Sequence, residues 1–269
     1  MKRILITCLV FAVLLSNQCF SGERNKCSTK DLMNQSIMGI LWMKTSGEYE
    51  ALCYQAYRML ELEMEQAASK RSSIGKPLAV IVDSDETVLD NMEYQSRLVL
   101  NGEEYAKKSW DEWCKQARSK AVPGAVECLK KAEKMGIEVF YVCNRQGIEG
   151  IEYVKENLEK VSLPYADKDH IVLPWKNGDK QSRLDIVASK YFIIAYVGDN
   201  LSDFPINAYK KSANDRLGIA RSHKNEFGTK FILLPNPVYG GWESGLSEDY
   251  SKLPTSKRLE IRESYLINE

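Results

Sequence analysis

A run of five apolar residues that stops at an acid constrains the fold of this chain more than any other feature. Leu78 to Val82 contains only apolar residues, and Asp83 and Asp85 follow closely. Such a continuous run is typical of a strand buried on both faces of a parallel sheet. Ligands bind where the strands of such a sheet end, so the two carboxylates are expected at a site of chemistry. An acidic turn after the strand is the alternative, because aspartate is common in turns.

The rest of the chain repeats this pattern of apolar strands and amphipathic helices. Further strands are expected at residues 137–143, 171–173, 192–197 and 230–234. Strands that alternate with helices predict an α/β fold, a parallel sheet flanked by helices. Residues 28–71 predict two helices that are separated at Ser46 and Gly47, so a mainly helical region precedes the sheet. We expect this region to pack on the core, with a lid or a homodimer surface as the alternatives.

The first residues predict an export signal rather than a part of the fold. Two basic residues precede an apolar stretch from Ile4 to Leu15, which is too short to span a bilayer comfortably. We expect residues 1–18 to be a signal peptide, with the cleavage site between 18 and 22. Cys19 lies where a bacterial lipoprotein carries its lipidated cysteine, and simple cleavage is the alternative. The expected location is the bacterial cell envelope, as an outer-membrane lipoprotein with membrane contact through the lipid or as a periplasmic protein.

Charge and cysteine content argue against several classes of protein. The chain has 37 basic and 37 acidic residues, and without residues 1–18, which include Lys2 and Arg3, the balance is 35 to 37. No basic face is indicated, so we expect no nucleic-acid partner. The seven cysteines show no C-x-x-C spacing, which argues against a zinc site and a dense disulfide framework. One or two disulfides of unassigned pairing are compatible with export.

Three of the predicted strands end in polar residues, and a lysine begins a helix between the last two. These residues are Asp83 and Asp85, Asn144 and Arg145, Asp199 and Asp203, and Lys180. Carboxylate oxygens are the ligands that Mg²⁺ prefers. Acids with a lysine also suit phosphoryl transfer, where catalysis consists mainly of positioning and neutralising charge. With two histidines and none of the common serine- or nucleotide-binding motifs, the nucleophile is expected among the carboxylates.

At this point the residues resemble a known family. Asp83-Ser84-Asp85-Glu86-Thr87 is similar to the D-x-D-x-T signature of the haloacid dehalogenase superfamily, a Rossmann-like fold of phosphatases with an aspartate nucleophile. Residues 198–204 resemble the acidic motif of the class C (four-aspartate) acid phosphatases, as do the segments 121–125, 140–145 and 239–243. The resemblance covers roughly residues 76–246. It implies a helical N-terminal region at 19–75, a catalytic core at 76–235 and a C-terminal segment at 236–269 that packs on the core.

The resemblance implies a Mg²⁺-dependent acid phosphatase that hydrolyses small phosphomonoesters, such as nucleoside monophosphates and aryl phosphates. Asp83 would be the nucleophile that forms an aspartyl-phosphate, and Asp85 the general acid and base. The Asp83 carboxylate, the Asp85 backbone carbonyl and Asp199 would hold Mg²⁺, and Asp203 would complete the acidic cluster. Lys180 would bind the phosphoryl group, with Lys176 as the alternative register.

One position departs from the pattern of the family. Cys143 stands where the family usually has a threonine before Asn144 and Arg145. A thiol is a weaker hydrogen-bond donor than a hydroxyl, so the phosphate contact would be weakened or made by backbone N–H groups. Arg145 would contact the substrate or form a structural ion pair.

Two aromatic residues match positions where the family stacks a nucleobase or an aromatic leaving group, Trp110 and Tyr239. Ring stacking tolerates many leaving groups, which suits a broad specificity. Ordinary packing is the alternative for both. For the whole chain, the alternatives to an acid phosphatase are a non-catalytic or weakly active surface-binding lipoprotein on the same fold, and a phosphotransferase.

Overall fold

The computed structural model describes residues 28–145, 150–174 and 177–267. The expected signal peptide, Cys19 and Lys176 lie outside the described residues. Among the helices of the described ranges, none has the length and apolar content that a membrane span requires.

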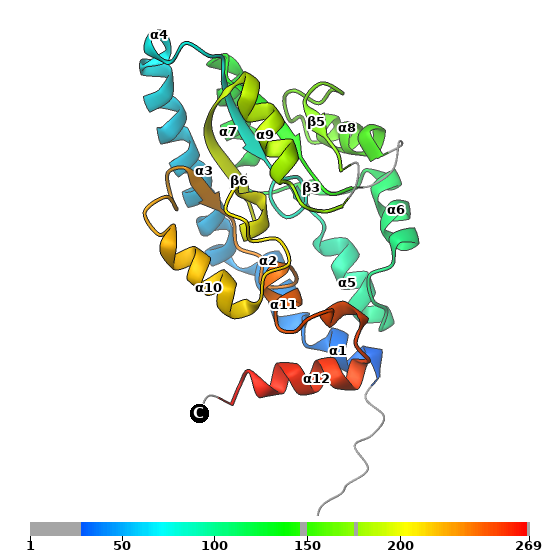
Figure 1. Ribbon diagram of the computed structural model, residues 1–269. Helices are drawn as coiled ribbons and strands as arrows, with labels where there is room; N and C mark the ends of the chain where they lie inside the picture. The colour runs from blue at the N-terminus through cyan, green and yellow to red at the C-terminus, as the bar shows by residue number, and fades with distance from the viewer. Residues whose placement is uncertain (1–27, 146–149, 175–176, 268–269) are drawn as a thin grey trace, which may run out of the picture.

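A five-stranded parallel sheet forms the centre of the molecule (Figure 1). Its strands are β1 (Leu78–Val82), β4 (Glu138–Val142), β5 (Ile171–Val172), β6 (Phe192–Gly198) and β7 (Phe231–Leu233). Their order is β5-β4-β1-β6-β7, and every neighbouring pair is parallel. The structure therefore confirms the α/β prediction, with a parallel sheet flanked by helices. The sequence did not predict the small antiparallel pair of β2 (Leu89–Asp90) and β3 (Lys120–Ala121).

The central strand β1 is buried because it packs against helices on both faces. Val80 and Val82 belong to a core cluster that includes residues of α3 (Gly47–Ser69) and α7 (Ala125–Lys134). Ile81 points to the opposite face, into a cluster with residues of α9 (Gln181–Lys190). All five residues of β1 are buried, as its uninterrupted apolar run predicts.

Four helices precede the sheet, namely α1 (Thr29–Asn34), α2 (Ile37–Thr45), α3 and α4 (Arg71–Ile74). The predicted break at Ser46 and Gly47 is confirmed, because the Ser46 side chain accepts a hydrogen bond from the Tyr49 N–H at 3.1 Å and caps α3. The buried face of α3 includes Leu60 and Met64 and packs against the sheet and α7.

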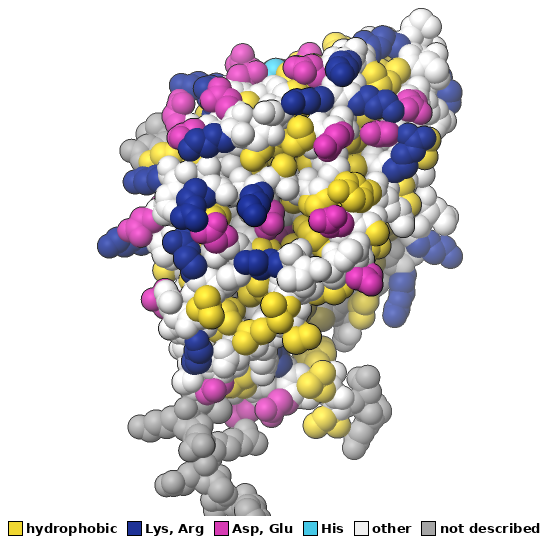
Figure 2. Space-filling model, turned by 180° about the vertical axis from the view of Figure 1, so that it is seen from behind, with side chains coloured by type: hydrophobic (Ala, Val, Ile, Leu, Met, Phe, Trp, Pro, Cys, Tyr) yellow, Lys and Arg dark blue, Asp and Glu magenta, His cyan; other side chains and the backbone are white. Residues whose placement is uncertain are grey.

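The remaining helices lie between and beyond the strands. They are α5 (Met92–Asn101), α6 (Lys107–Gln116), α8 (Gly150–Lys160), η1 (Leu201–Asp203), α10 (Ala213–Ser222), α11 (Gly241–Ser244), η2 (Tyr250–Lys252) and α12 (Thr255–Ser264). Of these, η1, α10, α11, η2 and α12 were not predicted. α12 packs against α1, so the two ends of the described chain lie side by side (Figure 1). On the face seen in Figure 2, basic and acidic side chains are interspersed.

Candidate active site

The end of β1 places Asp83 at the carboxyl edge of the sheet. The Asp83 backbone N–H donates a hydrogen bond to the Val197 carbonyl of β6 at 2.9 Å. Its carboxylate contacts the ammonium group of Lys180, which lies just before α9 and also contacts Asp203 at 2.8 Å. Burial raises the pKa of Asp83 to about 7, although Lys180 acts to lower it. The structure therefore brings Lys180 to the residue that we expect to be the nucleophile.

Three aspartates gather around this point, Asp83, Asp199 and Asp203. One carboxylate oxygen from each lies within 4.8 Å of the others. Burial, followed by repulsion from Asp203 and Asp83, raises the pKa of Asp199 well above its ordinary value. Burial alone would lower the pKa of Lys180, but the charges of Asp203 and Asp83 raise it, so this lysine is a cation at neutral pH. Three acids against one lysine leave an excess of negative charge.

The turn after β6 fixes the second half of the cluster. The Asp203 carboxylate accepts a hydrogen bond from the Asn200 N–H at 2.9 Å, and Asn236 donates to the Asp199 carboxylate at 2.8 Å. Gly198 is required here by space, because a Cβ at this residue would lie 2.3 Å from a carboxylate oxygen of Asp203. A local backbone N–H thus holds Asp203, and the side chain of Asn236, 37 positions away, holds Asp199.

The carboxylate of Asp85 lies apart from the three clustered aspartates and has its own partners. It accepts hydrogen bonds from Arg145 Nη2 at 2.7 Å, from Arg145 Nε at 3.2 Å and from Asn91 Nδ2 at 3.0 Å. Arg145 is only 3% exposed and lies over the Trp110 ring, 5.5 Å from its centroid. Arg145 therefore forms an ion pair that orients Asp85, and its contact with a substrate stays a prediction.

The end of β4 is tied to the loop before α9 by a buried arginine, Arg183. Its guanidinium donates to the Cys143 carbonyl at 2.6 Å and to the Asn144 side-chain oxygen at 2.6 Å. Asn144 in turn donates from its side chain to the Gly178 carbonyl at 3.0 Å. Cys143 is fully buried, and burial raises the pKa of its thiol to about 11. The thiol is therefore protonated at neutral pH.

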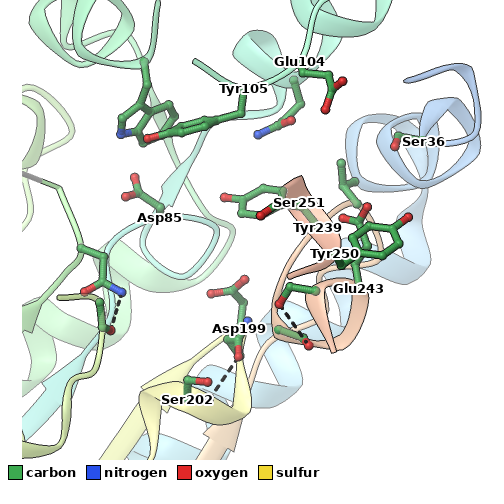
Figure 3. Close-up of a pocket in the computed structure, with 18 of the residues that line it drawn as sticks. Ser36, Asp85, Glu104, Tyr105, Asp199, Ser202, Tyr239, Glu243, Tyr250 and Ser251 are labelled. Carbon is green, nitrogen blue, oxygen red and sulfur yellow. Dashed lines mark hydrogen bonds between the residues drawn. The ribbon is translucent and has the colours of Figure 1, made fainter. Parts of the chain in front are cut away.

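A cavity of about 610 Å³ opens at this edge of the sheet (Figure 3). Asp83, Asp85 and Asp199 lie in its wall, and Asn144 and Lys180 also line it. Aromatic side chains form another part of the wall, namely Tyr105, Trp110 and Tyr239. Cys143 is not among the described residues that line the cavity. A volume of this size accepts a small organic ligand in addition to a phosphoryl group.

The sequence of the chain matches the family described as HAD superfamily, subfamily IIIB (Acid phosphatase), over residues 12–242, which is most of its length. The chain belongs to this acid phosphatase family. Its fold is similar to the class C acid phosphatase from Bacillus anthracis, with 36% identity and a TM-score of 0.84 over 88% of this chain and 99% of that one. The same enzyme with tungstate bound gives a TM-score of 0.83 at 36% identity, with the same coverage of both chains.

Membership confirms the haloacid dehalogenase-type fold and the expected class of enzyme, a phosphomonoesterase. HAD phosphatases use a divalent metal ion, and the cluster of Asp83, Asp199 and Asp203 offers oxygen ligands for one. A separate match covers 96 residues that are 29% identical to the aspartate–ammonia ligase of Malacoplasma penetrans. This match spans 35% of the present chain and 29% of the ligase, so it carries no argument about activity.

The acid phosphatase uses two buried polar residues that the sequence did not single out. Arg183 follows Lys180 by three residues, so both lie at the start of one helix, and this spacing was the available signal.

Glu86 has a left-handed backbone with φ of 57° and accepts hydrogen bonds from the Asn91 N–H at 2.8 Å and from the hydroxyl of Tyr239. Burial, then repulsion from Asp85 and Asp199, raises the pKa of Glu86 well above its ordinary value. Tyr239 thus has a polar anchor as well as a ring that faces the cavity.

Proposed function

We propose that this acid phosphatase hydrolyses small phosphomonoesters with Mg²⁺ as its cofactor and Asp83 as the covalent nucleophile. The observation that carries the proposal is the shared site of Asp83, Asp199 and Asp203, with Lys180 between Asp83 and Asp203. A buried aspartate beside one fixed cation and further carboxylates suits the formation of an aspartyl-phosphate.

The donor set fits Mg²⁺. All of the clustered ligand atoms are carboxylate oxygens, and the described site has no histidine or cysteine among them. Lys180 neutralises part of the charge, and burial, followed by repulsion between the carboxylates, raises the pKa values of Asp83 and Asp199. We propose that the Asp83 and Asp199 carboxylates hold the ion together with the Asp85 backbone carbonyl. The ion would neutralise the charge of the phosphoryl oxygens.

The chemical steps can be assigned to side chains of this chain. A carboxylate oxygen of Asp83 attacks phosphorus, and the bond from phosphorus to the ester oxygen breaks. Asp85 gives its proton to that oxygen, which leaves as an alcohol. Asp85 then takes a proton from water, and the resulting hydroxide attacks the aspartyl-phosphate to release phosphate and restore Asp83. Lys180 neutralises the phosphoryl oxygens throughout, and Arg145 keeps Asp85 in place.

We propose nucleoside monophosphates and aryl phosphates as the substrates. The support is the aromatic part of the cavity wall, where Trp110 and Tyr239 line the same space as Asp83 and Asp199. A flat leaving group that lies against these rings keeps its phosphate near the acids. Stacking discriminates little between rings, so a broad specificity follows.

Phosphate release from phenyl phosphate, measured with Mg²⁺ and then with EDTA, tests the proposal. We expect release that stops with EDTA and returns when Mg²⁺ is added in excess. The Asp83→Asn variant should be folded by circular dichroism and reduced on the order of 10⁴-fold in kcat, because the nucleophile is lost. Undiminished turnover in this variant would contradict the mechanism, and phosphate transfer to an added alcohol would identify a phosphotransferase instead.

We also propose export to the cell envelope, with the lipid attached at Cys19. The support is the order of two basic residues, the apolar stretch from Ile4 to Leu15 and the cysteine that follows it. Metabolic labelling with a radioactive fatty acid tests this, and a Cys19→Ser variant should lose the label and leave the membrane fraction.

A further inference from the structure

The cavity extends well beyond the aspartates, to a second group of charged side chains. We call this group the distal end and define it by Glu104, Glu243, Arg258 and Arg262 with the hydroxyl of Tyr250. It comes from the loop between α5 and α6 and from α11, η2 and α12. Figure 3 shows Glu104, Glu243 and Tyr250 on the opposite side of the cavity from Asp85. A leaving group that extends across the cavity from the side of Asp85 would therefore reach the distal end.

In the first charge pair of the distal end, Arg258 and Glu104 bind each other. Arg258 donates to the two carboxylate oxygens of Glu104, from Nη1 at 2.5 Å and from Nη2 at 2.6 Å. The arginine side chain is 9% exposed and the glutamate side chain 36% exposed. The remaining nitrogen of the guanidinium, Nε, is buried. The carboxylate, not the guanidinium, is thus the accessible half of this pair.

The second pair joins Arg262, whose side chain is 20% exposed, with Glu243, whose side chain is 21% exposed. Its guanidinium donates to Glu243 at 2.5 Å, to the hydroxyl of Tyr250 at 2.8 Å and to the side chain of Gln35 at 2.8 Å. A further bond at 3.2 Å joins it to the carbonyl of Leu32. Each of its three nitrogens has a protein acceptor, so little donor capacity is left for a ligand.

These contacts determine which leaving group the distal end suits. Two arginines and two glutamates make the group neutral, and the most exposed of the four side chains is the carboxylate-bearing Glu104. A carboxylate has about four lone-pair positions, and two of those of Glu104 are taken by Arg258. The others can accept O–H or N–H donors, whereas a second phosphate beside Glu104 would meet a carboxylate whose arginine is already engaged. Among the described residues that line the cavity, Lys210 is the remaining exposed cation.

We propose that the distal end selects uncharged leaving groups that offer hydrogen-bond donors, as a nucleoside does, and disfavours leaving groups with a second phosphate. The Glu104–Arg258 pair determines this selectivity. The inference rests on the proposed phosphatase function, because it concerns the leaving group of that reaction. Tyr105 follows Glu104 in the cavity wall, and its ring centroid lies 6.2 Å from that of Trp110, so a ring against this pair brings its substituents toward the distal end.

The test compares two substrates, a nucleoside 5′-monophosphate and the matching nucleoside 3′,5′-bisphosphate, at saturating Mg²⁺. The measured quantity is the ratio of kcat/KM for the monophosphate to kcat/KM for 5′-phosphate release from the bisphosphate. Glu104→Gln leaves Arg258 unpaired, so the ratio should fall about tenfold, whereas Arg258→Gln should raise it. In the double variant this pair of positions has no net charge again, and the ratio should return to within about twofold of that of the unaltered protein.

Glu93→Gln is the matched control, because Glu93 also pairs with an arginine, Arg118, but lies outside the cavity lining. Its ratio should stay within about twofold of the unaltered protein, since a surface ion pair contributes little. The unaltered protein also tests the proposal, because its KM for the bisphosphate should exceed its KM for the monophosphate. Equal or reversed KM values would overturn the proposal, and so would a shift of the ratio in the same direction in both single variants. In either case, phosphate release from the monophosphate would still support the phosphatase function. Absence of phosphate release from every monoester would instead refute the proposed function.

Discussion

The two ends of the cavity contain charged residues in different proportions. At the catalytic end, Lys180 is the one cation of the described residues that pairs with Asp83 and Asp203, and burial with mutual repulsion raises the pKa values of Asp83 and Asp199. At the distal end, each arginine has its own glutamate, Arg258 with Glu104 at 2.5 Å and Arg262 with Glu243 at 2.5 Å. The first end is short of positive charge, and the second is balanced.

This difference separates chemistry from recognition. Uncompensated buried carboxylates cost stability, so a fold retains them where a cation and a phosphoryl group complete the site. Paired charges hold segments in place and present a fixed pattern of donors and acceptors. The two ends should therefore respond in opposite ways when a charge is removed.

Removal of one acid from the catalytic end should have the largest effect. Asp199→Asn is expected to lower kcat/KM by about 10²- to 10³-fold, because the proposed metal ligand is lost. Without metal, the variant should nevertheless be more stable than the unaltered protein. Its Tm should be higher by about 2–4 °C for each kcal/mol of repulsion that the substitution relieves. Kinetics with Mg²⁺ and thermal unfolding in EDTA measure the two effects. A metal-free Tm below that of the unaltered protein would contradict the account of uncompensated charge.

The pH dependence of the metal-free protein follows from the same excess of acid. Asp83 has a pKa of about 7 in the folded chain and an ordinary aspartate value when unfolded, so the folded chain binds more protons between these values. The free energy of unfolding should therefore fall as pH rises from about 4 to 7 in EDTA. Urea unfolding at several pH values measures it. Asp83→Asn should reduce the slope, and the part that remains belongs to Asp199 and Glu86, whose pKa values are also raised.

The next effect concerns the buried arginine that connects β4 to α9. Arg183→Met removes its bonds to Cys143 and Asn144, so Lys180 should lose its alignment with Asp83 and kcat should fall about ten- to a hundredfold. Arg183→Lys retains the charge but cannot make both bonds. Its kcat should therefore lie between that of the unaltered protein and that of Arg183→Met. The inhibition constant of inorganic phosphate separates alignment from folding, because loss of folded protein alone would leave it unchanged.

Removal of a charge from the distal end should affect the free energy of unfolding more than the dependence of activity on Mg²⁺. Arg262→Gln breaks the contacts with Glu243 and Tyr250 and is expected to lower the free energy of unfolding by about 1–3 kcal/mol. Urea unfolding measures this loss. The Mg²⁺ concentration for half-maximal activity should not shift, and a large shift would show that the two ends are coupled.

The smallest effect is expected at Cys143. Its thiol is buried and does not line the cavity, so Cys143→Thr should change kcat/KM by about threefold or less, within the net contribution of one hydrogen bond. Its pKa of about 11 also predicts slow alkylation by iodoacetamide at pH 8 in the folded protein. A large gain of activity in the threonine variant would show that the departure from the family pattern weakens the site.

The sequence predicted the catalytic end better than the distal end, for a physical reason. β1, β4 and β6 are apolar runs, and each is followed by the polar residues that it carries to the sheet edge. α12 has no such signal, because its buried face consists of Leu259 and the charged Arg258, which resembles an exposed helix. The pairing of Glu104 with Arg258 joins residues 154 positions apart, and no local pattern encodes it.

The hydrogen bond from Tyr239 to Glu86 connects residues 153 positions apart in the chain. During synthesis the ribosome completes all four aspartates of the motifs once it has passed residue 203, yet the cavity wall still lacks Tyr239 and the arginines of α12. A nascent chain at that point contains the nucleophile without the enclosure that positions a substrate. Catalytic activity therefore reports on the completion of the polypeptide, and a C-terminal truncation before Tyr239 would retain the aspartates but lose the enclosed site.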